Sequence, residues 1–352
     1  MQGITTGAKR ISTLDGIRGW GALFVVIYHV FVQNFPLTAT SSEWLGGLLP
    51  FRGDSAVSAF FIVSGYALSV GYLRRNDLGV LARISVGRYF RLVVPIALGC
   101  AVVYLAVISG LVITPARMIA AGDLSVVTHF AFVGAFMFEP PVAGRPIPQL
   151  WTMPYELVGS FLTLLLVFLL SRRSWRFYGY FAVALVFLVV QPIYAAFVAG
   201  IILAEMRNSV GVADTHIPYS GYAFLIAAVA LAFTPQTGHP VLVTVLAAVI
   251  VWSAVCSRGG QRFLEHPFSQ FLGSISFPVY ILHGVVIHSL GVRLNILVDG
   301  SVSAGIVVNC IVVIASVILG WAFRWSDELG ISCSHLVTRI LLPERFRRVS
   351  IN

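Results

Sequence analysis

The chain has 352 residues, of which 58% are hydrophobic and only 11% are charged, and its mean hydropathy is +0.91. A soluble domain carries about twice that charged fraction, so the composition excludes a soluble globular protein and indicates a polytopic membrane protein. The net charge of +9 does not indicate a nucleic-acid partner, because the basic residues lie in short segments between apolar runs.

Apolar runs long enough to cross a bilayer recur from end to end. We expect an all-α, polytopic membrane helical bundle of about ten transmembrane helices. It would form a single integral-membrane domain over residues 1–352, with spans between 14 and 323 and a basic cytoplasmic tail at 324–352. The expected spans are 14–34, 55–73, 92–113, 149–170, 177–190, 192–206, 220–233, 240–257, 271–290 and 304–323. Those that begin at 177, 192 and 220 are short, which leaves the count open by one or two.

The distribution of basic residues predicts the orientation of the chain. Lys9 and Arg10 precede the first span, which places the N-terminus in the cytoplasm. On this layout 18 of the 23 Lys and Arg residues lie in cytoplasmic segments and four in outer ones, and the C-terminus is cytoplasmic too. The first apolar run is too long and too polar for a cleavable signal, so we expect a multi-pass protein of the cell (inner or plasma) membrane. The four cysteines are far apart and indicate neither a disulfide framework nor a metal site.

The longest outer connection, residues 114–148, contains an apolar piece, 126–138, that is too short to cross the membrane. We expect it to be interfacial, re-entrant or packed on the bundle. The proline-rich segment before Trp151 is typical of a fixed, non-helical approach to the fourth span.

The first span carries three ionisable residues on one face. At about 100° per residue, Arg18 and His29 come within roughly 20° of each other around the helix, and Asp15 lies within about 60° of both. The rise places His29 roughly 16 Å beyond Arg18, about half the hydrocarbon thickness. Charged groups at such depth usually line a polar cavity.

Each of the three residues also has a structural interpretation. Asp15 suits a helix N-terminus, Arg18 can extend its guanidinium to the inner surface, and His29 can bond a backbone carbonyl. Their common face favours a functional site, because three independent structural features seldom align.

Other spans add polar candidates. The second span begins with small residues and continues with FFIVSGY, and close helix packing explains Ser64 and Gly65 at least as well as a function does. Arg88 and Arg91 lie just before the expected start of the third span, share a helix face and have the forked groups that suit phosphates. Taken alone, such a pair at a cytoplasmic helix end more often reflects topology or lipid anchoring. Glu156 is the only carboxylate in its span and is therefore a functional candidate.

The ninth span contains Tyr280, His283 and His288. A histidine inside a packed bundle is commonly structural, and of these residues His283 is the better candidate for a functional role and His288 the weaker one.

Five motifs in order give the chain a family resemblance. They are LDGIRGWGALFVVIYH, FFIVSGY, GRYFRLVVP, LWTMPYEL and ISFPVYILH. The chain resembles the integral-membrane acyltransferases of acyltransferase family 3, which modify hydroxyl groups of sugars and other acceptors, many of them on bacterial surface polysaccharides. The likeness covers nearly the whole chain. Because the sequence ends soon after its last expected span, we expect no extracellular hydrolase-like domain of the kind fused to some relatives.

The resemblance implies roles for residues of this sequence. His29 and Arg18 would be central to transfer, Arg88 and Arg91 would help to hold the acyl donor, and Glu156 would be a site carboxylate. Asp15, Ser64, Tyr280 and His283 match motif positions of less defined role. The usual donor of the family is cytoplasmic acetyl-coenzyme A, a co-substrate rather than a bound cofactor, and its acceptors are commonly lipid-linked or extracytoplasmic.

Acyl transfer needs a base, charge stabilisation for the oxyanion and a grip on an anionic donor. His29 would be the base, with direct transfer and a covalent acyl-histidine both open. The expected partners are acyl-coenzyme A, a glycan or lipid-linked saccharide and membrane lipids. A transporter of a glycan, lipid or proton-coupled solute is the alternative, since a polar face through a bundle also suits a transport path. A third interpretation is a glycan or lipid carrier without chemistry.

Overall fold

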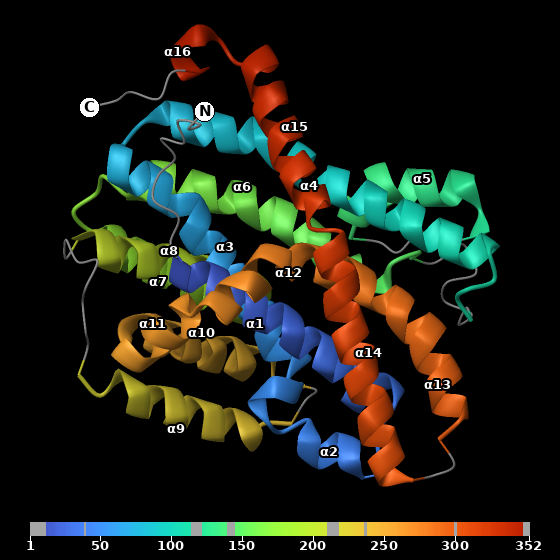
Figure 1. Cartoon of the computed structure of the whole chain (residues 1–352). Coiled ribbons are helices and arrows are strands. Elements are labelled where there is room, and N and C mark those ends of the chain that lie inside the picture. Colours follow the sequence, from blue (N-terminus) through green and yellow to red (C-terminus); the bar gives the residue numbers. More distant parts are fainter. Residues whose placement is uncertain are drawn as a thin grey trace.

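The computed structural model describes residues 12–38, 40–113, 122–138, 145–209, 218–235, 238–298 and 301–347. Within these ranges the chain is a bundle of helices with no strand, which confirms the all-α expectation (Figure 1). The α-helices are α1 (Ser12–Tyr28), α2 (Ser41–Leu45), α3 (Gly53–Arg75), α4 (Leu78–Ile108), α5 (Leu124–Phe132), α6 (Met153–Leu170), α7 (Arg176–Val190), α8 (Pro192–Ser209), α9 (Ser220–Ala232), α10 (Pro240–Cys256), α11 (Arg258–Glu265), α12 (Pro267–Val286), α13 (Val292–Ile296), α14 (Val302–Ala322), α15 (Trp325–Leu341) and α16 (Glu344–Arg347).

Six helical segments are long and apolar enough to cross a membrane. They are Ser12–Asn34, Gly53–Arg75, Leu78–Ile108, Pro148–Leu170, Pro267–Ile296 and Val302–Leu341. A seventh span results if α10 and α11, which meet at a bend of 86°, cross together. Each of the ten expected spans falls on a helix, but α7 and α9 are shorter apolar helices. The structure therefore supports a multi-pass membrane protein, while the count of ten and the orientation stay predictions.

The third span differs from expectation at its start. The predicted helix start at residue 92, with Arg88 and Arg91 before it, is wrong, because α4 begins at Leu78. The Asp77 side chain caps this helix by accepting a hydrogen bond from the Gly79 amide at 2.8 Å. The apolar run starts later than the helix does. Arginine is a good helix former, but it lowers the mean hydropathy by which a span is recognised in the sequence. Both arginines therefore have fixed directions on a continuous helix.

Glycines bring the central helices into backbone contact. A Cβ atom at Gly19 of α1 would lie 2.4 Å from the Gly273 nitrogen of α12, and one at Gly65 of α3 would lie 2.1 Å from the Phe197 carbonyl oxygen of α8. Small residues permit such close helix packing in membranes. The α1–α12 and α3–α8 contacts are among the most extensive in the bundle. They fix the helices that carry the predicted site residues.

Two peripheral segments, helix α5 and the C-terminal helices α15 and α16, lie against α4 (Figure 1). Helix α5, in the apolar piece of the outer connection, buries Phe130 and receives a 2.6 Å hydrogen bond from the Tyr89 hydroxyl at the Phe132 carbonyl. Of the three expectations for this piece, packing on the bundle is confirmed. Residues 139–144 of the proline-rich approach lie outside the described residues, and from Pro148 to Thr152 the approach is a 3-10 helix rather than non-helical.

The C-terminal tail forms α15 and α16. A Cβ at Gly330 of α15 would lie 2.6 Å from the Arg91 carbonyl oxygen, so α15 packs closely on α4. An Arg83 guanidinium nitrogen donates to the Phe346 carbonyl at 2.6 Å, which holds α16 to the same helix. Lys9, Arg10 and Arg348, on which part of the orientation argument rests, lie outside the described residues.

Candidate active site

His29 and His283 meet inside the bundle although 254 positions separate them in the chain. His283 Nε2 lies 3.3 Å from His29 Nδ1, and the ring centroids are 5.0 Å apart. His283 is 1% exposed, whereas His29 is half-buried. The α1–α12 contact thus places the histidine of the first motif against the histidine of the last one.

The helix is widened at His29 and again one turn after His283. A π-helix, His29–Asn34, begins at His29 itself, and a second, Ile287–Gly291, follows α12. The side-chain nitrogen Nδ2 of Asn34 donates a hydrogen bond to the His29 carbonyl at 2.7 Å. In a regular α-helix this carbonyl would accept from a backbone amide one turn later. Such π-turns occur frequently at functional sites.

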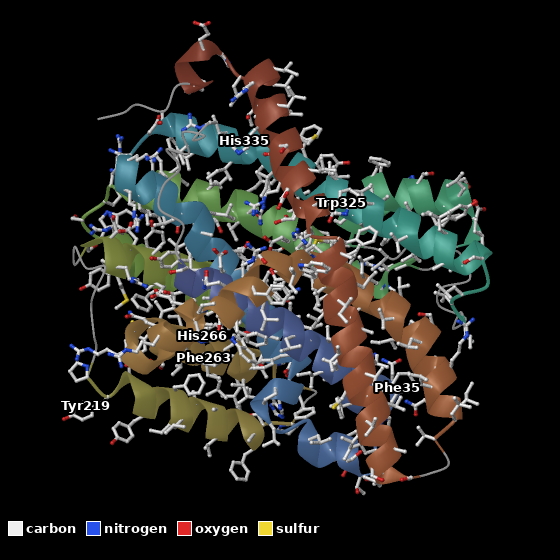
Figure 2. All side chains as sticks on the ribbon, in the orientation of Figure 1. Phe35, Tyr219, Phe263, His266, Trp325 and His335 are labelled. Atoms are coloured by element: carbon white, nitrogen blue, oxygen red, sulfur yellow. The ribbon has the colours of Figure 1, made fainter. Side chains whose placement is uncertain are left out.

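Phe35, which ends the first π-helix, fixes this region to the neighbouring helices. Its carbonyl accepts a 2.9 Å hydrogen bond from Asn309 of α14, and its ring would contact a Cβ placed at Gly291. Figure 2 shows Phe35 beside the lower part of α14. The C-terminal end of the π-helix that carries His29 is therefore anchored.

A buried ion pair forms the second part of the site. Arg88 of α4 pairs with Glu156 of α6, with side-chain exposures of 9% and 12%. Ser64 of α3 donates to Glu156 Oε1 and accepts from an Arg88 Nη2 hydrogen at 3.1 Å, and Ser160 accepts from Arg88 Nε at 2.8 Å. Three helices therefore meet at one carboxylate. Because removal of either charge leaves the other buried and unpaired, such a pair is strongly coupled to folding.

The hydrogen bonds do not use every polar atom of this pair. Glu156 accepts both of its side-chain hydrogen bonds at Oε1, and Arg88 donates from Nε and Nη2. Within the described part of the chain, Arg88 Nη1 and Glu156 Oε2 have no hydrogen-bond partner. Both atoms are available to a ligand.

Tyr280 connects the two pairs. Its hydroxyl donates to the Gln149 carbonyl at 2.5 Å and lies 2.8 Å from Thr152 Oγ1. Tyr280 is one turn from His283 on α12, and Thr152 is one turn from Glu156 at the start of α6. With about 5.4 Å for each turn, the His29–His283 pair and the Arg88–Glu156 pair lie on the order of 10–15 Å apart. The polar residues thus form one row through an apolar bundle.

The remaining predicted residues are placed as follows. Arg18 is half-buried, lies within electrostatic range of Arg88, and makes no hydrogen bond or ion pair to the described residues. Asp15 is on the same helix, with its carbonyl against Gly273 of α12. Arg91 is one turn beyond Arg88, and its carbonyl faces α15. Asp15 and Arg91 are close in sequence to site residues and make interactions of their own.

Sequence reasoning missed Gln149, Thr152 and Ser160. A signal for two of them was present, because Thr152, Glu156 and Ser160 recur every fourth residue and so form a polar stripe on an otherwise apolar helix. Gln149 had no such signal. Its amide donates to the Ile281 carbonyl at 3.2 Å, a partner that only the folded chain supplies.

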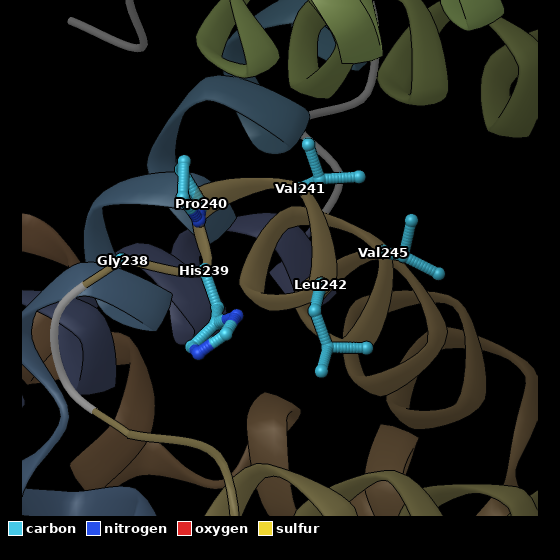
Figure 3. A pocket seen from close by; sticks show the side chains of 6 residues that line it. All are labelled: Gly238, His239, Pro240, Val241, Leu242 and Val245. Atoms are coloured by element: carbon cyan, nitrogen blue, oxygen red, sulfur yellow. The ribbon is translucent and has the colours of Figure 1, made fainter.

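The described residues line two hollows, a small one beside this row and a larger one away from it. A cavity of about 10 Å³ between the Pro146–Gln149 segment and α12 is lined by Gln149, Gly284 and His288 among others. That volume suits one water-sized group. A surface pocket of about 380 Å³ lies at the start of α10, around His239 and Pro240 (Figure 3). None of the predicted site residues lines the larger pocket.

Other histidines lie outside the row. His266 accepts from the Phe268 amide at 3.3 Å and caps α12, and His335 is exposed on α15.

The described residues form a multi-pass membrane protein with histidine, arginine and carboxylate side chains inside an apolar bundle. The sequence pattern of the acyltransferase domain of acyltransferase family 3 matches residues 11–325. The chain belongs to this family and is a membrane O-acyltransferase.

Among curated proteins, the chain is similar to the O-acetyltransferase PaAT-1 of Phomopsis amygdali. The two are 24% identical over 366 aligned positions, which cover 80% of this chain and 73% of the relative. No solved structure matches the chain.

Proposed function

We propose that the protein moves an acetyl group from acetyl-coenzyme A to a hydroxyl of a cell-surface or lipid-linked glycan, in the cell (inner or plasma) membrane. The observation that supports this proposal most is the polar row from Arg88 and Glu156 to His29 and His283. It offers a base, fixed positive charge and hydrogen-bond donors within one apolar bundle, which are the groups that acyl transfer requires.

His29 is the general base in this proposal. It lies in the α1–α12 contact, next to a π-turn, and its Nε2 atom has no hydrogen-bond partner among the described residues. It removes the hydroxyl proton of the acceptor while the oxygen attacks the thioester carbonyl. Proton transfer by a positioned side chain typically contributes about 10²–10⁴-fold to a rate.

The arginines hold the donor. Arg88 keeps Nη1 available while Glu156 fixes the rest of its guanidinium, and Arg91 extends the basic face by one turn of α4. Forked guanidinium groups bind phosphate oxygens well. The nucleotide end of acetyl-coenzyme A then lies on the side of Arg91, and its thioester arm follows the row toward His29.

The charge balance along the thioester arm is set by four residues, Arg18, Asp15, Glu156 and Ser64. Arg18 adds positive charge to the polar face of α1, within electrostatic range of Arg88. Glu156 and Ser64 fix Arg88, and Asp15 shares the polar face of α1. The chemistry uses a co-substrate, so the proposal includes no permanently bound cofactor.

The proposal is tested with protein reconstituted in lipid vesicles and supplied with carbon-13 acetyl-coenzyme A and the lipid-linked saccharides of the source cell. Mass spectrometry of the saccharides and release of free coenzyme A are measured together. We expect labelled acetyl esters and an equal amount of free coenzyme A. Uptake of saccharide without donor consumption would contradict the proposal and favour a transporter.

Variants separate donor binding from turnover. We expect Arg91→Ala to raise the KM for the donor, and His29→Ala to remove turnover with donor binding retained. Arg88→Ala should raise the KM for the donor and also lower the Tm, because it leaves Glu156 buried without its counter-ion. Transfer by His29→Ala at the wild-type rate would show that another residue is the base.

A further inference from the structure

Only one hydrogen-bond arrangement gives a partner to each of the three ring nitrogens at the His29–His283 contact, which are His29 Nδ1, His283 Nδ1 and His283 Nε2. His283 Nδ1 faces the Val279 carbonyl at 3.1 Å, and a carbonyl can only accept. In a neutral imidazole only one ring nitrogen carries hydrogen, so Nδ1 is the donor of His283 and Nε2 is an acceptor. His283 therefore presents a lone pair to His29.

The same argument assigns the tautomer of His29. Its Nδ1 atom faces two acceptors, the Val25 carbonyl at 2.8 Å and His283 Nε2 at 3.3 Å. The hydrogen of neutral His29 thus lies on Nδ1 and is shared between them. The lone pair of His29 then lies on Nε2, which has no hydrogen-bond partner among the described residues.

Building on the proposed function, we infer that His29 Nε2 is the nitrogen that takes the acceptor's hydroxyl proton, and that His283 is the positioning residue that fixes the His29 ring for this task. His283 acts through His29 and need not touch the substrate. Catalytic histidines are commonly oriented by a group that accepts a hydrogen bond from the ring nitrogen not used in catalysis, and His283 does this for His29 Nδ1.

The step balances without a further reactant. The O–H bond of the acceptor breaks, its proton binds to His29 Nε2, and the oxygen forms a bond with the acyl carbon. The C–S bond then breaks, the departing sulfur takes the proton from Nε2, and the products are an ester and the free thiol. His29 returns to its neutral Nδ1–H form.

A neutral orienting partner suits this site. A carboxylate at the position of His283, which is 1% exposed, would carry the desolvation cost of a buried charge. An imidazole is neutral in the resting state, yet its lone pair stabilises the Nδ1 hydrogen of a protonated His29, because hydrogen bonds to charged donors are about twice as strong.

Substitutions at His283 distinguish positioning from packing. The terminal amide of Gln reaches the location of His Nε2, whereas that of Asn reaches only the location of Nδ1. We expect His283→Leu and His283→Asn to lower kcat by about 10²-fold with an unchanged KM for the donor. His283→Gln, which supplies an acceptor oxygen to His29, should recover kcat to within ~10-fold of wild type. The exposed His335→Gln on α15 is the matched control and should leave kcat unchanged.

The tautomer is measured directly by nitrogen-15 NMR of histidine-labelled wild-type protein in lipid, assigned with His29→Ala. We expect a protonated Nδ1 and an unprotonated Nε2 for His29. Hydrogen on Nε2 in the resting protein, or equal kcat for His283→Leu and wild type, would overturn the inference. If His283→Leu or His283→Asn does not fold, the wild-type spectrum and the kcat of His283→Gln still test the inference. An enzyme that transfers no acetyl group from its donor would contradict the proposed function instead, since the tautomer is read without turnover.

Discussion

The ion pair between Arg88 and Glu156 gives the sharpest test of whether the polar row is functional or only structural. Glu156→Gln removes a charge but keeps the shape of the side chain, and leaves a guanidinium that is 9% exposed without its counter-ion. Breaking a buried pair in this way costs about 3–5 kcal/mol. A decrease in Tm on the order of 10 °C follows.

Thermal unfolding can be followed with a thiol-reactive dye in detergent, because Cys100 and Cys256 are buried and become reactive only on unfolding. Glu328→Gln is the control, since Glu328 is an exposed carboxylate on α15. We expect a large decrease in Tm for Glu156→Gln and none for Glu328→Gln. Equal Tm values for both variants would refute the ion pair as described.

The double variant separates the two roles. Replacing both charges with apolar residues of similar volume, Arg88→Met with Glu156→Leu, is often close to neutral for stability. We expect it to recover the Tm but not acyl transfer, because the donor loses a phosphate-binding group. Wild-type transfer by the double variant would show that the pair is purely structural.

Three further predictions concern the rest of the row and its scaffold. Tyr280→Phe removes the hydroxyl bonded to the Gln149 carbonyl, and should lower both kcat and stability, the latter by about 1–3 kcal/mol, in transfer and unfolding assays. Gly65→Val places side-chain atoms against the Phe197 carbonyl and should abolish folded protein in size-exclusion chromatography, whereas Gly221→Ala, with nothing within 4 Å of its Cβ, should not. Arg18→Ala should lower kcat with an unchanged Tm, since its guanidinium makes no hydrogen bond or ion pair to the described residues, and a decrease in Tm comparable with that of Glu156→Gln would contradict this.

Local periodicity predicted part of the fold and site. The eleven-residue spacing of Arg18 and His29 identified a polar face, and the apolar runs located helices at all ten expected spans. Hydropathy failed at the start of α4, where a helix continues through Arg83, Arg88 and Arg91. It also cannot decide which apolar helices cross the membrane when several are short.

The pairings could not be predicted. Arg88 and Glu156 were each visible as charges in apolar surroundings, but their contact depends on how α4 and α6 cross. His29 and His283 lie at opposite ends of the chain, and no periodic pattern links them. Gly65 illustrates the converse: its role in close packing was one of two interpretations of the small-residue run, and the contact with α8 confirms it, whereas the adjacent Ser64 belongs to the ion-pair site.

The central claim is that His29 catalyses acyl transfer to a hydroxyl of a glycan. It is tested most directly by proton NMR and mass spectrometry of the surface glycans from cells that lack the gene and from cells restored with wild type or His29→Ala at equal expression. The account predicts that one O-acyl signal is lost without the gene and returns with wild type but not with His29→Ala. Full return of the signal with His29→Ala would contradict it.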